Sequence, residues 1–405
     1  MASFKNVAAA AGLIGLVTCA YGQASGTATP ADESMIGAPV QLTTRDKFVK
    51  AGEAYFSPDG KFIIFQAVSI PEKGKEPSPF YAMFLGELKR DAAGRVTGLG
   101  ETRQVSPPGS ANTCGWFHPT DRARILYGST MDAPSENQPS GFQVGTRSYR
   151  WQFPTEMEVA TQTPLLLVQA YGLKAGTDCG TDHVAHPAFK REGYDAECSY
   201  SKDGRFILYT HVELKVKEEG KPGVPDADIW IYDTKTGEQR PLVVAPGYDG
   251  GPFFSPDGAR ICYRSDRKSN DLLQVYVATL KLDNAGVPIG VVNERAITDN
   301  TEVNWAPYWH PSGKFLIYGN SGTDHKNYDL WVSEVGTEEP TAKLRKKRIT
   351  VKEGADILPA FTSDGKWLMW TTQRGPKVEG EEKPSSQLWI AEWKGGETPY
   401  ADAAK

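Results

Sequence analysis

The chain has 405 residues, more than one ordinary globular core contains, so length alone predicts two or three domains. It holds 41 glycines and 28 prolines, and 11% of its residues are aromatic. This mixture favours many short strands joined by tight turns, and it excludes a long helical bundle or a disordered chain. The net charge of −5 provides no basic surface, which excludes nucleic acid and an anionic membrane as partners.

The N-terminal residues resemble a secretory signal. An apolar run at residues 7–17 is followed by Ala20-Tyr21-Gly22, which predicts a signal peptide over residues 1–22. Eleven apolar residues are too few to span a bilayer, and no later segment is long enough, so we expect no membrane span. We therefore predict a periplasmic or secreted protein. Cys19 leaves lipoprotein anchoring as an alternative.

Four cysteines remain after the predicted cleavage, and their spacing matches neither a zinc ribbon nor a CxxC redox motif. An oxidising compartment permits disulfides, but buried free thiols are an equally good interpretation. The pairing is left open among these residues: Cys114, Cys179, Cys198 and Cys262.

One short motif recurs six times along the chain. An aromatic residue and a turn of the type Ser-Pro-Asp-Gly are followed by an apolar strand, and the later copies are spaced by about 54 residues. Pro presets φ at the second turn position, Asp accepts local backbone hydrogen bonds and Gly takes positive φ. The two complete copies are Ser57, Pro58, Asp59 and Gly60, and Ser255, Pro256, Asp257 and Gly258.

A period of this length fits a blade of four strands, so the sequence predicts an all-β fold, a six-bladed β-propeller over residues 38–394. The last copy has no fourth strand of its own, and residues 39–43 resemble the missing strand. An N-terminal strand is therefore expected to complete the last blade and close the ring. The second blade carries an insertion at about residues 131–194. A short segment at 23–37 precedes the propeller, and a tail at 395–405 follows it.

The repeat resembles the PD40 (WD40-like) repeat of TolB-like six-bladed propellers. The segments Gly193-Tyr194-Asp195 and Gly247-Tyr248-Asp249 resemble ones that recur in bacterial exported members of this group. The resemblance covers nearly the whole mature chain and implies the fold more strongly than a function. TolB itself has an N-terminal α/β domain, for which residues 23–40 are too short. Prolyl oligopeptidases add a hydrolase domain, but this sequence has no G-x-S-x-G elbow. Oligogalacturonate lyases use a similar propeller alone, with channel histidines and a metal.

Residues with carboxylate or amide side chains recur six positions before five of the six turns. In a propeller the strand before the turn lies innermost, so these side chains are expected to surround one channel mouth. Such a ring would hold Ca²⁺ or meet a basic partner segment. The alternative is that these residues cap their own loops by side-chain hydrogen bonds. The predicted binding residues are Asn112, Asp195, Asp249, Asn304 and Asp356, with Glu53 and Glu197 nearby.

The histidines supply weaker candidates. His118 and His310 take the Ser position of the repeat, where a histidine is expected to bond to its own turn. Asp182, His183 and His186 cluster within the second insertion and would suit zinc, but a polar loop gives the same composition. In the same insertion, residues 149–153 would either provide aromatic contacts on one propeller face or pack internally.

These observations predict a monomeric, exported, non-enzymatic scaffold that binds a protein or cell-envelope polymer at one channel mouth. No nucleophile motif, metalloprotease motif, P-loop or dinucleotide fingerprint occurs, so we predict no catalytic residues. No cofactor is predicted, apart from a possible Ca²⁺ or other divalent metal. The alternative function is a propeller-type polysaccharide lyase or hydrolase with a divalent metal in the channel.

Overall fold

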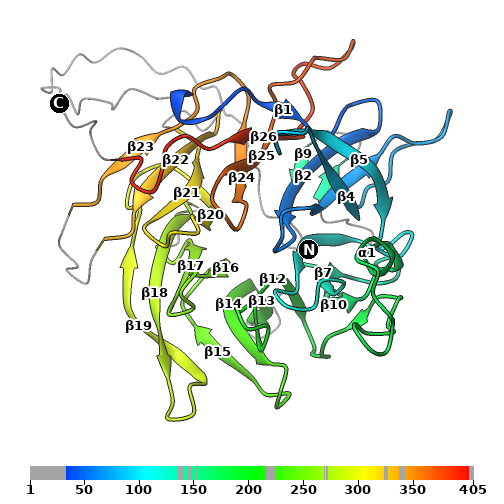
Figure 1. Ribbon diagram of the computed structural model, residues 1–405. Helices are drawn as coiled ribbons and strands as arrows, with labels where there is room; N and C mark the ends of the chain where they lie inside the picture. The colour runs from blue at the N-terminus through cyan, green and yellow to red at the C-terminus, as the bar shows by residue number, and fades with distance from the viewer. Residues whose placement is uncertain are drawn as a thin grey trace, which may run out of the picture.

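Six four-stranded antiparallel sheets stand side by side around a central axis in the computed structural model (Figure 1). The structure describes residues 33–135, 141–143, 148–150, 153–215, 224–268, 270, 272–322, 327–336 and 343–400. The first strand of each sheet contacts the first strands of its neighbours, so these six strands form the inner ring. The prediction of a six-bladed β-propeller is therefore confirmed, and the predicted signal peptide lies outside the described residues.

Each blade runs outward from its inner strand. The first three blades contain β2 (Phe48–Phe56), β3 (Phe62–Ser69), β4 (Ala82–Arg90) and β5 (Val96–Gln104); β6 (Asn112–Phe117), β7 (Ile125–Ser129), β10 (Glu158–Gln162) and β11 (His186–Pro187); and β12 (Tyr194–Tyr200), β13 (Phe206–Lys215), β14 (Val224–Asp233) and β15 (Gln239–Val243).

The last three blades repeat this order. They contain β16 (Asp249–Phe254), β17 (Arg260–Ser265), β18 (Gln274–Leu282) and β19 (Pro288–Ala296); β20 (Asn304–Trp309), β21 (Phe315–Asn320), β22 (Asp329–Glu334) and β23 (Lys346–Arg348); and β24 (Asp356–Phe361), β25 (Trp367–Thr372), β26 (Gln387–Glu392) and β1 (Val40–Gln41).

The ring closes through the N-terminal strand, as predicted. β1 pairs antiparallel with β26, with Val40 opposite Ile390 and Gln41 opposite Trp389. A further bridge joins Ile36 to Trp393. These pairings cover the outer edge of β26, which would otherwise offer unpaired backbone groups to solvent.

The second blade contains its extra residues in two places. The β7–β10 connection carries the hairpin of β8 (Gly141–Gln143) and β9 (Ser148–Arg150), and the β10–β11 connection carries α1 (Leu165–Ala170). Two strands of the blade, β10 and β11, therefore lie inside the segment assigned to an insertion. The first connection ends against the third and fourth blades, where the Phe153 ring lies 5.1 Å from Tyr194 and 6.4 Å from Tyr248. Phe153 thus packs internally.

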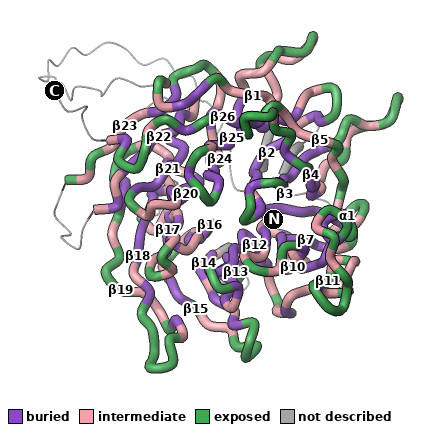
Figure 2. The backbone as a smooth tube through the Cα atoms, viewed as in Figure 1, coloured by how far each residue is buried: buried purple, intermediate pink, exposed green. Residues whose placement is uncertain are grey.

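Burial follows the repeat. Figure 2 shows the inner and second strands largely buried, and the outer loops and hairpin tips exposed. Aromatic residues of the second strands pack between blades, and Trp370, Tyr127, Tyr209, Tyr263 and Tyr318 are each no more than 2% exposed. The core is therefore divided among the interfaces between neighbouring blades. A 3-10 turn, η1 (Glu33–Met35), precedes β1, and none of the described helices is long and apolar enough to cross a membrane.

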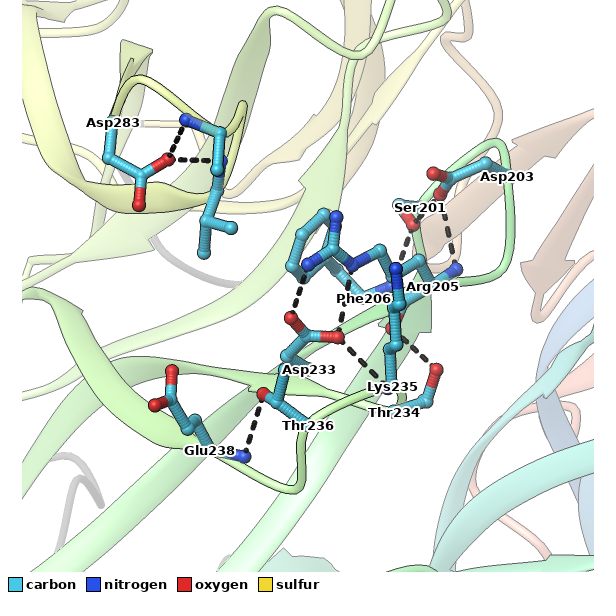
Figure 3. A network of polar contacts seen from close by, with 12 residues as sticks. Ser201, Asp203, Arg205, Phe206, Asp233, Thr234, Lys235, Thr236, Glu238 and Asp283 are labelled. Atoms are coloured by element: carbon cyan, nitrogen blue, oxygen red, sulfur yellow. Dashed lines mark hydrogen bonds and ion pairs between the residues drawn. The ribbon is translucent and has the colours of Figure 1, made fainter.

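The repeated turn is held by its own side chains, as the third blade shows (Figure 3). Ser201 Oγ donates to Asp203 Oδ1 at 2.5 Å and accepts from the Phe206 amide at 2.9 Å. Gly204 takes a φ of 76°, which an L side chain rarely adopts. Arg205 then pairs with Asp233 at 2.7 Å and joins the turn to the third strand. The Ser57 and Ser255 turns use the same Ser–Asp hydrogen bond.

Candidate functional site

Every inner strand bulges at the same place, two residues after the position that holds Asn or Asp in five blades and Ala51 in the first, which we call the Asx position. The pairing with the second strand shifts register there in all six blades. The bulged residue has a positive φ of 43–60° in each blade, although only one of the six is glycine. Such backbone is uncommon for other residues and is concentrated at functional sites. We call these six residues the axial positions: Glu53, Cys114, Glu197, Gly251, Ala306 and Leu358.

Aromatic rings meet across the axis two residues after four of these positions. Tyr55 lies 5.6 Å from Phe253 of the fourth blade, and Trp116 lies 6.2 Å from Tyr308 of the fifth. Neighbouring rings of this group are also close, for example Tyr55 and Trp116 at 4.9 Å. We call these four residues the aromatic floor. A small pocket is lined by all six axial positions and by three residues of the aromatic floor, Tyr55, Phe253 and Tyr308.

Glu197 is held rigidly at one side of the pocket. Its carboxylate accepts from Tyr248 Oη at 2.6 Å, the Gly251 amide at 2.6 Å and Thr210 Oγ1 at 3.0 Å. Arg264 adds a cation, with Nη2 3.1 Å from Glu197 Oε1. Both side chains of this pair are largely buried, at 12% and 2% exposed. Glu197 is thus a fully paired carboxylate.

Two glycines of β16 make room for this arrangement. A Cβ on Gly251 would lie 2.2 Å from Arg264 Nη1, and a Cβ on Gly250 would lie 2.3 Å from Tyr248 Oη. The fourth blade therefore contributes backbone alone at these positions. The space a side chain would fill is taken by Arg264 and Tyr248, which reach Glu197 from the neighbouring blade.

Glu53 faces the same pocket with weaker partners. Its Oε1 accepts from Cys114 Sγ at 2.9 Å and from Tyr55 Oη at 3.3 Å. Its own amide donates to Thr371 Oγ1 of the last blade at 3.0 Å, which fixes the bulge. Burial raises the pKa of the Glu53 carboxyl, because the thiol and phenol hydrogen bonds and the charge of Arg264 only partly offset the loss of water.

The predicted aspartates of the channel mouth are completely buried, and each is paired within its own blade. Asp195 meets His211 Nδ1 at 2.7 Å. Asp249 meets Arg267 and Asp356 meets Arg374, both at 2.8 Å. The two arginine braces also bond to the hydroxyls of Ser265 and Thr372, residues equivalent to one another in the repeat. All three aspartates are 0% exposed, so their side chains brace strands, and a direct contact with a partner stays a prediction.

The two predicted asparagines are buried in the same way. Asn112 donates to the Tyr81 and Ser110 carbonyls, at 2.9 and 3.0 Å. Asn304 donates to Gln274 Oε1 at 3.1 Å and accepts from Asn320 at 2.9 Å. These contacts match the alternative in which Asx side chains organise their own loops.

The weak metal candidates of the second insertion point to different partners. His183 Nδ1 lies 2.8 Å from the Thr163 carbonyl, and Asp182 faces Arg124 at 3.4 Å. His186 Nε2 is 3.8 Å from Asp182. Across the part of the chain that the structure describes, no three His, Cys, Asp or Glu residues are arranged to hold a metal ion.

The remaining predictions concern two histidines of the repeated turns and four cysteines. His118 Nδ1 accepts from the Asp121 amide at 2.9 Å, and His310 Nδ1 accepts from the Ser312 amide at 3.2 Å, which confirms that both bond to their own turns. Four free thiols are buried, so the free-thiol alternative holds in the structure: Cys114, Cys179, Cys198 and Cys262.

Sequence reasoning named Glu53 and Glu197 but missed the residues that complete the pocket. Arg264, Tyr248 and Cys114 contact these carboxylates from other blades. Their local sequence does not indicate such contacts, although Tyr248 lies in one of the segments that carry the family resemblance. The available signal was the repeat register, because counting two and four residues beyond each Asx position finds the axial positions and the aromatic floor.

Comparison with known proteins gives partial similarity to one curated protein and distant similarity to solved structures. No protein-family model matches the chain. The uncharacterized peptidase YuxL of Bacillus subtilis is 27% identical over 200 residues, which are 42% of this chain and 28% of that protein. TolB from Acinetobacter baumannii is 15% identical with a TM-score of 0.45, covering 83% of this chain and 64% of that chain. Oligogalacturonate lyase from Vibrio parahaemolyticus is 12% identical with a TM-score of 0.44, covering 90% and 96%. The chain thus spans under two thirds of the first two proteins.

Proposed function

We propose that this protein is an exported propeller that acts as a non-enzymatic scaffold, binding a protein or cell-envelope polymer through the pocket at the channel axis. The observation that carries the proposal is the pair of carboxylates, Glu53 and Glu197, held by bulged backbone above the aromatic floor. A concave site with a few oriented polar groups and aromatic walls is the usual form of a ligand site.

The composition of the pocket supports binding over the lyase alternative. Among the described residues, its lining contains carboxylates, thiols, phenols and one guanidinium, but no histidine. His118 and His310 are committed to their turns, and His211 is paired with Asp195. Arg264 forms an ion pair with Glu197, so both side chains are already held in place before a partner binds. Such preorganisation suits recognition of a partner.

The proposal is tested by a substitution that fills the pocket and keeps the backbone conformation of the bulge. Ala306 occupies the axial position of the fifth blade with a φ of 52°, and the sixth blade holds a leucine there, Leu358, at 54°. An Ala306→Leu substitution should therefore be tolerated by the backbone. We expect it to abolish capture of a partner from an envelope extract, at an unchanged melting temperature.

Ala296→Leu is the matched control, because Ala296 is exposed at the end of the outer strand β19. It should capture the partner as the wild type does. Ala306→Met provides a second filled pocket if the leucine variant folds poorly. Equal capture by wild type and by both filled variants would contradict a channel binding site.

A further inference from the structure

The buried carboxylates around the axis differ in one respect, the cation that neutralises each of them. The chain supplies Arg264 to Glu197, Arg267 to Asp249 and Arg374 to Asp356. It supplies a histidine to Asp195. No described lysine, arginine or histidine forms an ion pair with Glu53, although Glu53 is only 9% exposed.

An unpaired carboxylate is costly in such a place. Burial removes its water, and two weak donors, a thiol and a phenol, cannot replace a cation. Both donors converge on Oε1. The second oxygen, Oε2, has no hydrogen-bond partner among the described residues, and Glu53 lines the pocket. One acceptor of a nearly buried carboxylate that lines the pocket is thus left without a partner in the described part of the chain.

The walls beside Glu53 are suited to a positive charge. Tyr55, Phe253 and Tyr308 of the aromatic floor line the same pocket and offer π-electron density. Arg264, itself a lining residue, already places one cation at this pocket. Its guanidinium carbon lies 5.4 Å from the Tyr248 ring centre and 5.7 Å from that of Trp305, two rings behind the lining residues.

We propose that Glu53 and the aromatic floor bind a primary ammonium group, the end of a lysine side chain of a protein partner. The inference rests on the proposed binding function and names the chemistry of that site. An ammonium is a compact point charge on a slender stem, whereas a guanidinium is broad and planar. The pocket is small and Arg264 already forms part of its lining, which favours the smaller group.

The test uses three acetylated pentapeptide amides, Gly-Gly-X-Gly-Gly, with X as lysine, Nε-acetyl-lysine or arginine. Binding to the full protein is measured by isothermal titration calorimetry at constant ionic strength. We expect the lysine peptide to bind, and the neutral Nε-acetyl peptide to bind at least tenfold more weakly, because a charge-assisted hydrogen bond is lost. An arginine peptide that binds as tightly would overturn the choice of an ammonium.

Glu53→Gln keeps the shape of the side chain and removes its charge. It should weaken the lysine peptide at least tenfold, whereas Glu87→Gln on the exposed face of β4 should leave it unchanged. A chitosan trimer, which carries amines on sugars, distinguishes the source of the ammonium. If the trimer binds more tightly than the lysine peptide, the inference of a protein partner is wrong.

A wild-type pH titration gives a second measurement that does not depend on a variant. Glu53 is faced by Tyr55, Tyr81, Cys114, Glu197, Cys198 and Arg264. Burial raises the pKa of its carboxyl, so the affinity for the lysine peptide is measured from pH 8 down to pH 5. Lysine-peptide binding should weaken as pH falls, because protonated Glu53 no longer attracts an ammonium. Binding that stays constant over this range would overturn the inference.

The two proposals fail separately. If Ala306→Leu abolishes capture of the envelope partner while Glu53→Gln captures it normally, binding at the channel stands and the ammonium inference is wrong. If neither substitution changes capture, the channel binding function itself is refuted.

Discussion

The arginine braces give the sharpest prediction about stability. Arg374 and Asp356 are 5% and 1% exposed, with Arg374 Nη2 2.8 Å from Asp356 Oδ2. Arg374 Nε also donates to Thr372 Oγ1 at 3.3 Å, and its guanidinium lies over the Trp370 ring. Replacing Arg374 with leucine leaves a fully buried carboxylate whose remaining side-chain partner is Trp370 Nε1, at 3.0 Å.

Removing one partner of a buried ion pair costs about 3–5 kcal/mol. For a chain of this length the entropy of unfolding is about 0.8 kcal/mol/K near the midpoint, so the melting temperature should fall by about 4–6 °C. Arg374→Leu is measured by circular dichroism melting. The double variant Asp356→Asn, Arg374→Leu should recover much of the loss, because the unpaired charge is gone.

Arg95→Leu is the control, since Arg95 pairs with Asp91 while 73% of its side chain is exposed. It should leave the melting temperature nearly unchanged. If Arg374→Leu melts within 1 °C of the wild type, or if the double variant is no better than the single one, the brace does not stabilise the blade as argued.

Three further predictions concern other parts of the ring. Burial raises the pKa of Glu158 from 4.5 to about 7, so this carboxyl destabilises the fold progressively as pH rises from 4.5 to about 7, and the full loss persists above that. Glu158→Gln should therefore have a higher melting temperature than the wild type at pH 8, and this difference should nearly disappear by pH 5. A difference in melting temperature that is the same at both pH values would contradict this. Gly204→Ala should lower the free energy of unfolding more than Gly237→Ala does. Both glycines have positive φ, but only a Cβ on Gly204 would lie 2.5 Å from the His118 ring. Equal losses of unfolding free energy in chemical denaturation would refute the role of this contact. The four buried thiols should react with a thiol reagent only on unfolding, and a reductant should not change the melting temperature; a lower value would indicate a disulfide.

Much of the fold was predictable because the repeat determines it locally. Each turn depends on residues close together in the sequence, such as Ser201, Asp203 and Gly204, and each apolar strand follows directly. The ring closure by residues 39–43 followed from counting strands. The strands β10 and β11 were harder to place, because they are short and lie between long loops.

The sequence by itself determined the number of blades, the order of strands and the positions of Glu53 and Glu197. Only the tertiary structure decided which carboxylates carry a partner, because Arg264 reaches Glu197 from the next blade and Thr371 fixes the Glu53 bulge from the last one. Contacts across blade interfaces leave no local pattern, since the repeat makes all six strands look equivalent. From the sequence, the residues at the Asx position therefore resembled a binding surface. In the structure they are buried and pair within their own blades, and Glu53 is the buried carboxylate for which the described residues provide no ion pair.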